Sequence, residues 1–536
     1  MAALLLLRDL NDQIVASLSI GLFALLVVWV ASEKPNSRQA RAVSALIDRL
    51  LAVETGDLNS PAPRILHEEM PALASAVDGL FKQVRSNLDN VHTMAMYDPV
   101  TSLPNRIHFK REAERILKAR RSSEPLALLF VDLDGFKEVN DSLGHAQGDQ
   151  ILIKVANRLR AVVKDEVAHG NLLHPLIARL AGDEFTLLFP SIRTPQESER
   201  IAQRILGGLS ESFELAGQKI AIGASIGVAL CPDDGVDLTS LMKAADIAMY
   251  HAKASGRSQV CCFSNALGAA FEEKSRIEKD LRVSLGRNEF ELVFHPQYCI
   301  QTGAIVAGEA LVRWHHPTDG IKLPQSFIGI AEESSLILDI GDWIAATATQ
   351  TVARWQARGM NQRLTFNVSA RQLEQPSFFP QLRRAMTEAG APPWLLELEF
   401  TETLAMRCSD ALMTEIAALR ADGVSITIDD FGSGYSNLAR MKDMPLDRVK
   451  LDWSLTKDID RSESARTIVA SVVHLIHGLD AQVVAEGIER REQLDVLRAI
   501  GCDLVQGYVF APPMGDEEFT QWIEASSDRG PQVLRA

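Results

Sequence analysis

Eight strand-like apolar runs between residues 275 and 525 constrain the fold of this chain more than any other feature of its sequence. Helical stretches separate all but the first two runs, and this alternation is typical of a parallel sheet with crossover helices. Only about ten residues link the first two runs, too few for a parallel crossover, which predicts an antiparallel hairpin. We therefore expect a (β/α)8-like barrel whose first strand is antiparallel. The runs lie near 290–294, 304–312, 363–367, 396–400, 424–429, 447–450, 481–485 and 502–505.

Most of these runs end on a polar side chain. In barrels of this kind the chemistry takes place at the C-terminal ends of the strands, so the end residues are expected to converge. A carboxylate that leaves an apolar strand is costly unless a cation pairs with it. The pattern therefore predicts an active-site rim. Its residues are Glu309, Asn367, Glu399, Asp429 with Asp430, Lys450, Glu486 and Gln506.

The first four of these residues offer oxygen atoms from successive parallel strands, and hard oxygen ligands in that number suit Mg²⁺ or Mn²⁺. Asp430 is placed to hold a second ion, and two ions can activate water and stabilise the leaving oxygen in phosphodiester cleavage. Arg313 can bind a phosphate with its planar guanidinium, and Lys450 can orient or acidify the attacking water. Taken singly, these residues also suit helix caps, turns or strand ends. Their joint arrangement favours a site.

The motifs that contain these residues are Glu309-Ala310-Leu311, Asn367-Val368-Ser369, Glu399-Phe400-Thr401-Glu402, Asp429-Asp430-Phe431-Gly432-Ser433-Gly434, Lys450-Leu451-Asp452, Glu486-Gly487-Ile488-Glu489 and Gln506-Gly507-Tyr508. In this order the set resembles EAL-domain cyclic di-GMP phosphodiesterases. The resemblance implies hydrolysis of cyclic di-GMP to linear pGpG with Mg²⁺ or Mn²⁺.

The resemblance also implies roles for single residues. It makes Lys450 the lysine that coordinates water, Glu486 the general base, Gln506 its support and Arg313 a phosphate contact. Residues 430–438 match a mobile loop that couples dimerisation to activity, with Glu402 as its anchor. The chain departs from the family's Tyr-Gln-Pro at Phe294-His295-Pro296. The implied metal ligands are Glu309, Asn367, Glu399, Asp429 and Asp430.

Residues 96–264 predict a second kind of domain, an antiparallel-rich α+β fold of ferredoxin-like character. A strand at 126–131 ends at Asp132, and the apolar segment 176–189 reads as a hairpin with Asp183-Glu184 at its turn. The two aspartates can hold Mg²⁺ on a nucleotide triphosphate. The sequence Asp132-Leu133-Asp134 taken alone, an Asp-x-Asp pattern, is more often a surface loop than a metal site. Further candidates are Asn140 and Asp149 for a purine edge, and Lys253 and Arg257 for phosphates.

Together with Asp98-Pro99-Val100-Thr101-Ser102-Leu103-Pro104-Asn105-Arg106 and Gly144-His145-Ala146-Gln147-Gly148-Asp149, this set resembles a GGDEF diguanylate cyclase domain. The family joins two GTP molecules, one from each domain of a dimer, into cyclic di-GMP. The resemblance makes Asp132 and Asp183 metal ligands, Glu184 catalytic support, and Asn140 and Asp149 guanine contacts. Here the signature begins Ala181-Gly182, which makes cyclase activity less expected, and 172–175 lacks the family's inhibitory Arg-x-x-Asp.

The N-terminal region predicts attachment to a membrane. After a short segment, 1–12, residues 13–32 carry no charge and are long enough to span a bilayer, although a signal peptide is the alternative. Basic residues follow the span, so the positive-inside rule places the rest in the cytoplasm of a single-pass inner (cytoplasmic) membrane protein. Residues 33–95 resemble a HAMP relay, whose two helices would carry apolar stripes through Ile47 and Leu80 and form a homodimer; a plain helical hairpin is the alternative.

Composition excludes some functions. The formal charge of −15 argues against nucleic-acid binding, which needs a basic surface. The six cysteines form no Cys-x-x-Cys pair and suit a reducing compartment. We expect the barrel at 275–525 to be the enzyme, the 96–264 domain to bind GTP as a regulator or also to synthesise cyclic di-GMP, and 526–536 to be a tail. The alternatives are a dominant diguanylate cyclase or a non-catalytic cyclic di-GMP receptor.

Overall fold

The computed structural model describes residues 38–54, 57, 59–120, 124–170, 175–192, 194–215, 217–433 and 438–529. The chain divides into two compact units, Met1–Ala269 and Ala270–Ala536. The membrane helix predicted at 13–32 lies outside the described residues. In the part of the chain that is described, no helix is both long and apolar enough to span a bilayer.

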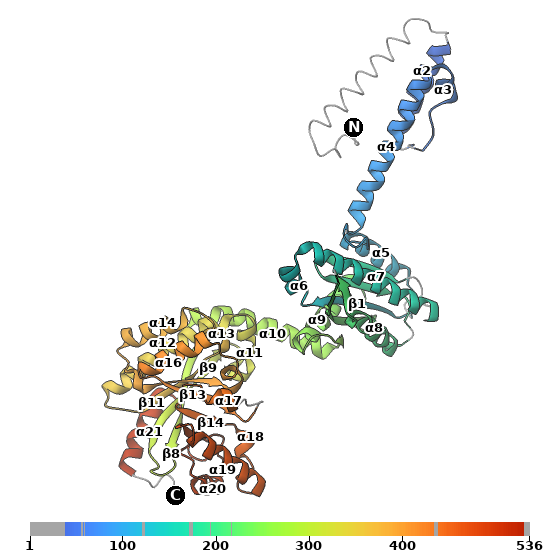
Figure 1. Cartoon of the computed structure of the whole chain (residues 1–536). Coiled ribbons are helices and arrows are strands. Elements are labelled where there is room, and N and C mark those ends of the chain that lie inside the picture. The colour runs from blue at the N-terminus through green and yellow to red at the C-terminus, as the bar shows by residue number, and fades with distance from the viewer. Residues whose placement is uncertain are drawn as a thin grey trace. The chain divides into compact units, whose positions relative to one another are not determined.

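The helical segment that precedes the first domain contains α2 Arg38–Glu54, α3 Arg64–Glu69 and α4 Pro71–Met96 (Figure 1). Of the residues in the predicted apolar stripes, Val43 and Val77 are buried in this single chain, while Ile47 and Leu80 are 38% and 56% exposed. Helix α3 packs against both longer helices. The shared core is Ala42, Leu46, Ala62, Leu66, Ala74, Val77 and Phe81.

The first domain is an α+β fold on a five-stranded sheet with the order β2-β3-β1-β6-β7. All neighbours are antiparallel except β6 and β7, so the antiparallel-rich prediction is confirmed. The central strand β1 is almost fully buried, since helices cover both faces of the sheet. The elements are α5 Arg106–Ala119, β1 Leu126–Asp134, α6 Phe136–Leu143, α7 His145–Gly170, β2 Leu176–Ala181, β3 Glu184–Phe189, α8 Pro195–Ser210, β4 Phe213–Leu215, β5 Gln218–Ile220, β6 Gly223–Cys231, α9 Leu238–Ala254 and β7 Val260–Cys262.

The second domain is a closed barrel with the strand order β9-β11-β12-β13-β14-β15-β16-β8, in which β8 pairs with β9 to close the ring. The first strand, β8, is antiparallel to both of its neighbours, as the short first connection predicted. The other barrel pairs are parallel. The strands are β8 Phe290–Cys299, β9 Ile305–His316, β10 Gly320–Lys322, β11 Arg363–Asn367, β12 Leu396–Thr401, β13 Ser425–Phe431, β14 Arg448–Leu451, β15 Gln482–Ala485 and β16 Leu504–Val505.

Helices connect the parallel strands and cover the outside of the barrel. The last of them, α21, extends into the segment predicted as a tail. They are α10 Asn265–Ser284, α11 Ile328–Glu333, α12 Leu336–Ala357, α13 Ala370–Leu373, α14 Phe378–Ala389, α15 Glu402–Ala405, α16 Asp410–Ala421, α17 Leu438–Met441, α18 Trp453–Thr456, α19 Glu463–His477, α20 Arg491–Ile500 and α21 Asp516–Arg529, with 3₁₀ turns η2 Leu285–Arg287, η3 Pro324–Ser326 and η4 Pro393–Leu395.

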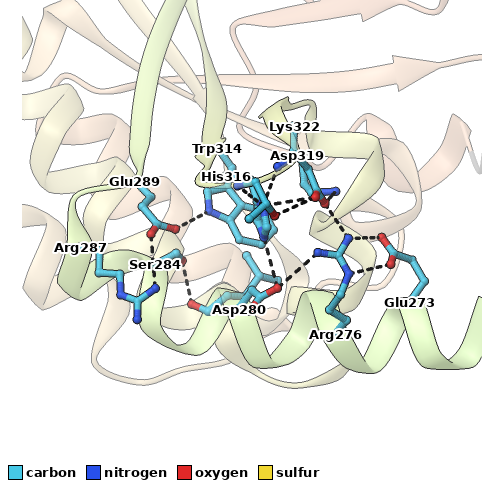
Figure 2. A network of polar contacts seen from close by, with 12 residues as sticks. Glu273, Arg276, Asp280, Ser284, Arg287, Glu289, Trp314, His316, Asp319 and Lys322 are labelled. Carbon is cyan, nitrogen blue, oxygen red and sulfur yellow. Dashed lines mark hydrogen bonds and ion pairs between the residues drawn. The ribbon is translucent and has the colours of Figure 1, made fainter.

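A polar network links α10 to the hairpin formed by β9 and β10 (Figure 2). The sequence predicted β9 but not the short strand β10. Arg276 of α10 lies 2.6 Å from Asp319 in the hairpin turn. Asp280, one turn further along α10, lies 3.2 Å from Nε2 of the buried His316. Because β9 also carries Glu309, this network fixes the helix against a strand that supplies the rim.

Candidate active site

The carboxylates predicted at the barrel rim lie together. Oxygen atoms of Glu309, Glu399 and Asp429 are within 4.8 Å of one another, and so are those of Asp429, Asp430 and Glu486. Glu399, Asp429 and Asp430 lie near the C-terminal ends of β12 and β13, and Glu486 directly follows β15. Glu309 lies within β9, which continues beyond it to His316, and all four strands run in the same direction around the barrel. Closure of the sheet therefore brings together acids that are up to 177 positions apart in the sequence (309 to 486).

Lys450, in β14, stands in the middle of these acids and is 1% exposed. Its Nζ lies 2.7 Å from Glu486 and 2.9 Å from Glu399. Glu309 and Asp429 are each 3.3 Å away. Burial opposes its charge, but the surrounding carboxylates outweigh burial and hold the pKa of Lys450 well above its ordinary value. The lysine is thus a permanent cation within the acidic cluster.

The carboxyl groups differ because their partners differ. Burial raises the pKa of Glu399 well above its ordinary value, with the charges of Glu309 and Asp429 adding to it. Burial acts on Glu309 too, but Lys450 and a hydrogen bond from Gln506 outweigh it and lower the pKa of Glu309. Burial, together with neighbouring carboxylates, raises the pKa of Glu486 to about 8. A carboxylate with that pKa accepts a proton readily near neutral pH.

Two amide side chains complete the rim. Asn367 Nδ2 lies 3.2 Å from Glu309 Oε1 and 3.5 Å from Glu399 Oε2. Gln506 Nε2 donates to Glu309 Oε2 at 2.6 Å and contacts His295 Nδ1 at 2.9 Å. The two amides therefore set the orientation of both glutamates. To bind a cation directly, Asn367 must present its Oδ1, the oxygen of the same amide.

His295 is a rim residue whose contacts sequence reasoning did not predict. Since Gln506 donates to Nδ1, the ring carries its hydrogen on Nε2, which donates to the carbonyl of Ala511 at 3.2 Å. Burial lowers the pKa of His295, which favours this neutral form. The ring also stacks on Tyr508, with 5.8 Å between centroids. The hairpin register could have found it, because His295 lies opposite Glu309.

Arg313 and the loop after β13 flank the cluster. Arg313 is half-buried in β9, and burial lowers the pKa of its guanidinium. Its only hydrogen bond among the described residues runs to the carbonyl of Val312. Glu402 accepts a hydrogen bond from Gly432 N at 2.9 Å, so it holds the start of the predicted loop. Residues 434–437 of that loop lie outside the described residues.

The first domain gathers a smaller set of acids. Asp132 in β1 lies directly opposite Glu184 in β3, and Asp183 occupies the turn before β3. Lys253 Nζ of α9 lies 2.8 Å from Asp132 Oδ2. Burial raises the pKa of Asp132 to about 6, with Lys253 acting in the opposite direction and Asp183 adding to the rise. Arg106 Nη2 is 3.9 Å from Glu184.

The other predicted site residues of this domain are Asn140, Asp149 and Arg257. Asn140 in α6 packs against Gly148, the residue before Asp149 in α7, so the two purine-binding candidates are neighbours. Arg257 follows α9 in a left-handed conformation, with φ of 62°.

Two protein families match this chain. Residues 278–513 match the EAL domain family, and residues 95–259 match the family of the diguanylate cyclase, GGDEF domain. The chain contains a GGDEF domain followed by an EAL domain. The two matched ranges include both acid clusters.

The relatives are cyclic di-GMP proteins. The bifunctional diguanylate cyclase/cyclic di-GMP phosphodiesterase MucR of Pseudomonas aeruginosa is 37% identical over 427 residues, 79% of this chain and 61% of that protein. The cyclic di-GMP phosphodiesterase NbdA of the same organism is 36% identical over 453 residues, 84% of this chain and 57% of that protein. The chain therefore spans less than two thirds of these relatives. A solved PaMucR phosphodiesterase–c-di-GMP complex is 33% identical, covering 46% of this chain and 99% of its own, with a TM-score of 0.44.

The donor set of the EAL domain fits divalent cations. It offers two groups of carboxylates that share Asp429, all with hard oxygen atoms. Asp430 reaches the second group through a positive φ of 55°, a conformation that costs energy for a residue other than glycine. A site that holds two cations would account for the two carboxylate groups and for the strained backbone of Asp430.

The GGDEF domain contains one acid that the sequence did not single out. Asp246 of α9 lies two turns before Lys253 on the same helix face, and the charges of Asp246 and Glu184 interact. Burial raises the pKa of Asp246. The spacing of seven residues between Asp246 and Lys253 was the available signal. Ala181, the departure from the family signature, is not among the described residues with positive φ, so its methyl group causes no left-handed strain.

Proposed function

We propose that the EAL domain hydrolyses cyclic di-GMP to linear pGpG and requires Mg²⁺ or Mn²⁺. The observation that carries the proposal is the double carboxylate cluster around Lys450 and Asp429 at the barrel rim. Every residue that the family resemblance assigns to the metals is present in this chain. Cyclic di-GMP is also the ligand named for both of the curated relatives described above.

In this proposal each residue has a separate task. Glu309, Glu399, Asp429, Asp430 and Asn367 hold the cations, which supply Lewis-acid activation of water and neutralise phosphate charge. Glu486 accepts the proton of the attacking water, for which a pKa of about 8 is suitable. Lys450 orients that water through its charged N–H donors, and Arg313 binds the phosphate. Gln506 keeps Glu309 ionised and correctly turned.

The deciding experiment incubates the purified full chain with cyclic di-GMP and Mg²⁺ or Mn²⁺ and separates the products. We expect pGpG, and we expect EDTA to abolish it. A folded protein that releases no pGpG with either metal would contradict the proposal. Cyclic di-GMP binding without turnover would instead favour a receptor.

For the GGDEF domain we propose GTP binding, either as a regulator of the EAL domain or as the substrate for synthesis of cyclic di-GMP. The supporting observation is that Asp132, Asp183 and Glu184 are retained and lie at adjacent strand ends. Incubation of the full chain with GTP and Mg²⁺, with Glu309→Ala in place to prevent hydrolysis of any product, separates the two roles. Cyclic di-GMP would indicate synthesis, and an effect of GTP on wild-type hydrolysis would indicate regulation.

We also propose that residues 13–32 anchor the protein in the inner membrane, with both catalytic domains in the cytoplasm, and that the HAMP-like segment forms a homodimer. The support comes from the uncharged span and the basic residues that follow it. Fractionation of cells that express the full chain, compared with a chain that begins at residue 33, tests the anchor. Light scattering of the detergent-extracted protein tests the dimer.

A further inference from the structure

Two inward-facing side chains of the EAL barrel lack polar partners. Gln297 in β8 and Thr365 in β11 are both 0% exposed. Among the described residues, no group hydrogen-bonds to Nε2 or Oε1 of Gln297 or to Oγ1 of Thr365. Buried polar side chains in folded proteins nearly always have a partner, which is either protein or ordered water. These three atoms therefore point to a ligand.

Strand geometry places both side chains inside the barrel, one level below the rim. Side chains two positions apart in a strand share a face. Gln297 follows His295 by two residues, and His295 contacts Gln506 at the rim. Thr365 precedes Asn367 by two residues, and Asn367 contacts Glu309. Both residues thus face the barrel axis beneath the acid cluster.

The strand between Gln297 and Thr365 carries a small side chain, Ala307, on its inner face. Strand β9 lies between β8 and β11, and its Ala307 pairs with Gln297 on one side and with Arg363 on the other. Ala307 is 0% exposed and shares its face with Glu309. Strands lie roughly 4.8 Å apart, so β8 and β11 are separated by roughly 10 Å, which leaves room over the alanine for more than one small molecule.

On the next strands around the barrel, β12 to β14, the buried polar side chains near this level are paired, although Glu397 of β12 lies directly beside Thr365. Thr427 Oγ1 of β13 lies 2.5 Å from Glu397 Oε1, and Arg448 Nη1 of β14 lies 2.7 Å from Glu397 Oε2. The protein therefore satisfies these polar groups with its own side chains. Among the described residues, it leaves those of Gln297 and Thr365 without a protein partner.

We propose that ordered water occupies the barrel interior over Ala307 and bridges Gln297 to Thr365, beneath the acid cluster. Water suits the unpartnered atoms because it can accept from the Gln297 amide, donate to its carbonyl oxygen and do either with the Thr365 hydroxyl. A metal ion does not suit them, since it cannot accept the N–H donors of Gln297. Buried water is retained where two to four polar groups hold it.

The test uses the sign of a stability change. Thr365→Val removes the hydroxyl and keeps the shape. In a dry interior it would remove an unsatisfied group and raise the unfolding temperature. With bridging water we expect a fall of about 2–4 °C, because the water loses a partner. Thr427→Val is the matched control. It loses the hydrogen bond to Glu397, so its unfolding temperature should fall whether the interior is dry or holds water. Tryptophan fluorescence of the full chain follows the EAL domain, because every tryptophan except Trp29 lies between 314 and 522.

A second measurement detects the water itself. Water ¹⁷O relaxation dispersion reports molecules held for long times inside a protein, and we expect its amplitude to fall in the Gln297→Met/Thr365→Val variant relative to wild type. A rise in unfolding temperature for Thr365→Val, or an unchanged dispersion amplitude, would overturn the proposal. So would a loss of stability when choline replaces Na⁺ and K⁺, because that would assign a cation. None of these readouts depends on cyclic di-GMP hydrolysis.

Discussion

The two acid clusters of this chain differ in enclosure. In the EAL barrel the central cation, Lys450, is 1% exposed and lies within 3.3 Å of four carboxylates. In the GGDEF domain the corresponding cation, Lys253, is 34% exposed and, among the described residues, forms its ion pair with Asp132. A closed sheet directs the ends of many strands toward one axis, whereas an open sheet has only a few strands beside any one point. The barrel therefore gathers more acids around its lysine than the open sheet does.

The largest expected effect comes from Lys450→Met. This change leaves four carboxylates without their cation, and breaking a buried ion cluster costs about 3–5 kcal/mol in the free energy of unfolding. Hydrolysis of cyclic di-GMP should fall by about 10²–10⁴-fold, the size of a lost proton-transfer or orientation partner. Thermal unfolding and pGpG release measure the two effects, and saturating Mg²⁺ should restore part of the stability.

Lys253→Met is the matched variant in the open site. We expect a smaller loss of stability than in Lys450→Met, because Lys253 is partly exposed and contacts the one buried carboxylate of Asp132. Equal losses of stability in the two variants would show that enclosure does not distinguish the sites.

The second effect is a pH dependence of the GGDEF site. The raised pKa of Asp132, about 6, means that a proton competes with Mg²⁺ below that pH. Affinity for a non-hydrolysable Mg²⁺–GTP analogue should rise as pH increases toward 6 and level off above it, with a slope of about tenfold per unit on the acid side. Calorimetric titrations between pH 5 and 8 measure it. Asp132→Asn should bind weakly at every pH, and a parallel slope in that variant would refute the assignment.

The third effect comes from the contact between His295 and Gln506 in the EAL barrel. His295→Leu removes the acceptor that fixes the Gln506 amide, and the loss of one hydrogen bond of about 1 kcal/mol predicts a five- to tenfold fall in kcat/KM. His295→Gln, which restores the residue type of the family pattern, should remain within about threefold of wild type. Steady-state kinetics on cyclic di-GMP measures both. A larger loss with glutamine than with leucine would contradict the role of His295 as an acceptor.

The smallest effect is expected from Ala181→Gly. Because Ala181 needs no positive φ, glycine brings no conformational advantage, and GTP affinity should change by less than about threefold. Equilibrium binding of the GTP analogue measures it, with Asp183→Asn as the variant that should lose binding. A large gain with glycine would show that the alanine methyl obstructs the nucleotide directly.

Sequence reasoning predicted the barrel well because its signals are local. Apolar runs and the helices between them predicted six parallel-type connections and one hairpin, and β8 and β9 pair as the short link required. The same reasoning did not predict that α3 packs against both long helices, since this contact is not visible in the period of either one. It also did not predict β10, a strand of three residues.

The candidate sites show the same division. The acids at the rim could be named because each follows an apolar run, and so could Asp132, while Glu184 could be named from the hairpin turn. The contacts of His295 and the proximity of Asp246 to Glu184 could not, because each depends on a neighbour in another element. Tertiary contacts also give chemically similar acids opposite shifts, such as the raised pKa of Glu399 and the lowered pKa of Glu309.

The sequence by itself determined the order of strands and helices and the chemical groups at the strand ends, since both follow from residue types and short-range periodicity. Only the tertiary structure decided that four carboxylates surround Lys450, that His295 supports Gln506, and that Gln297 and Thr365 are buried without a protein partner. The physical reason is that closure and register join segments far apart in the chain. Burial then sets the strength of every charge that those segments carry.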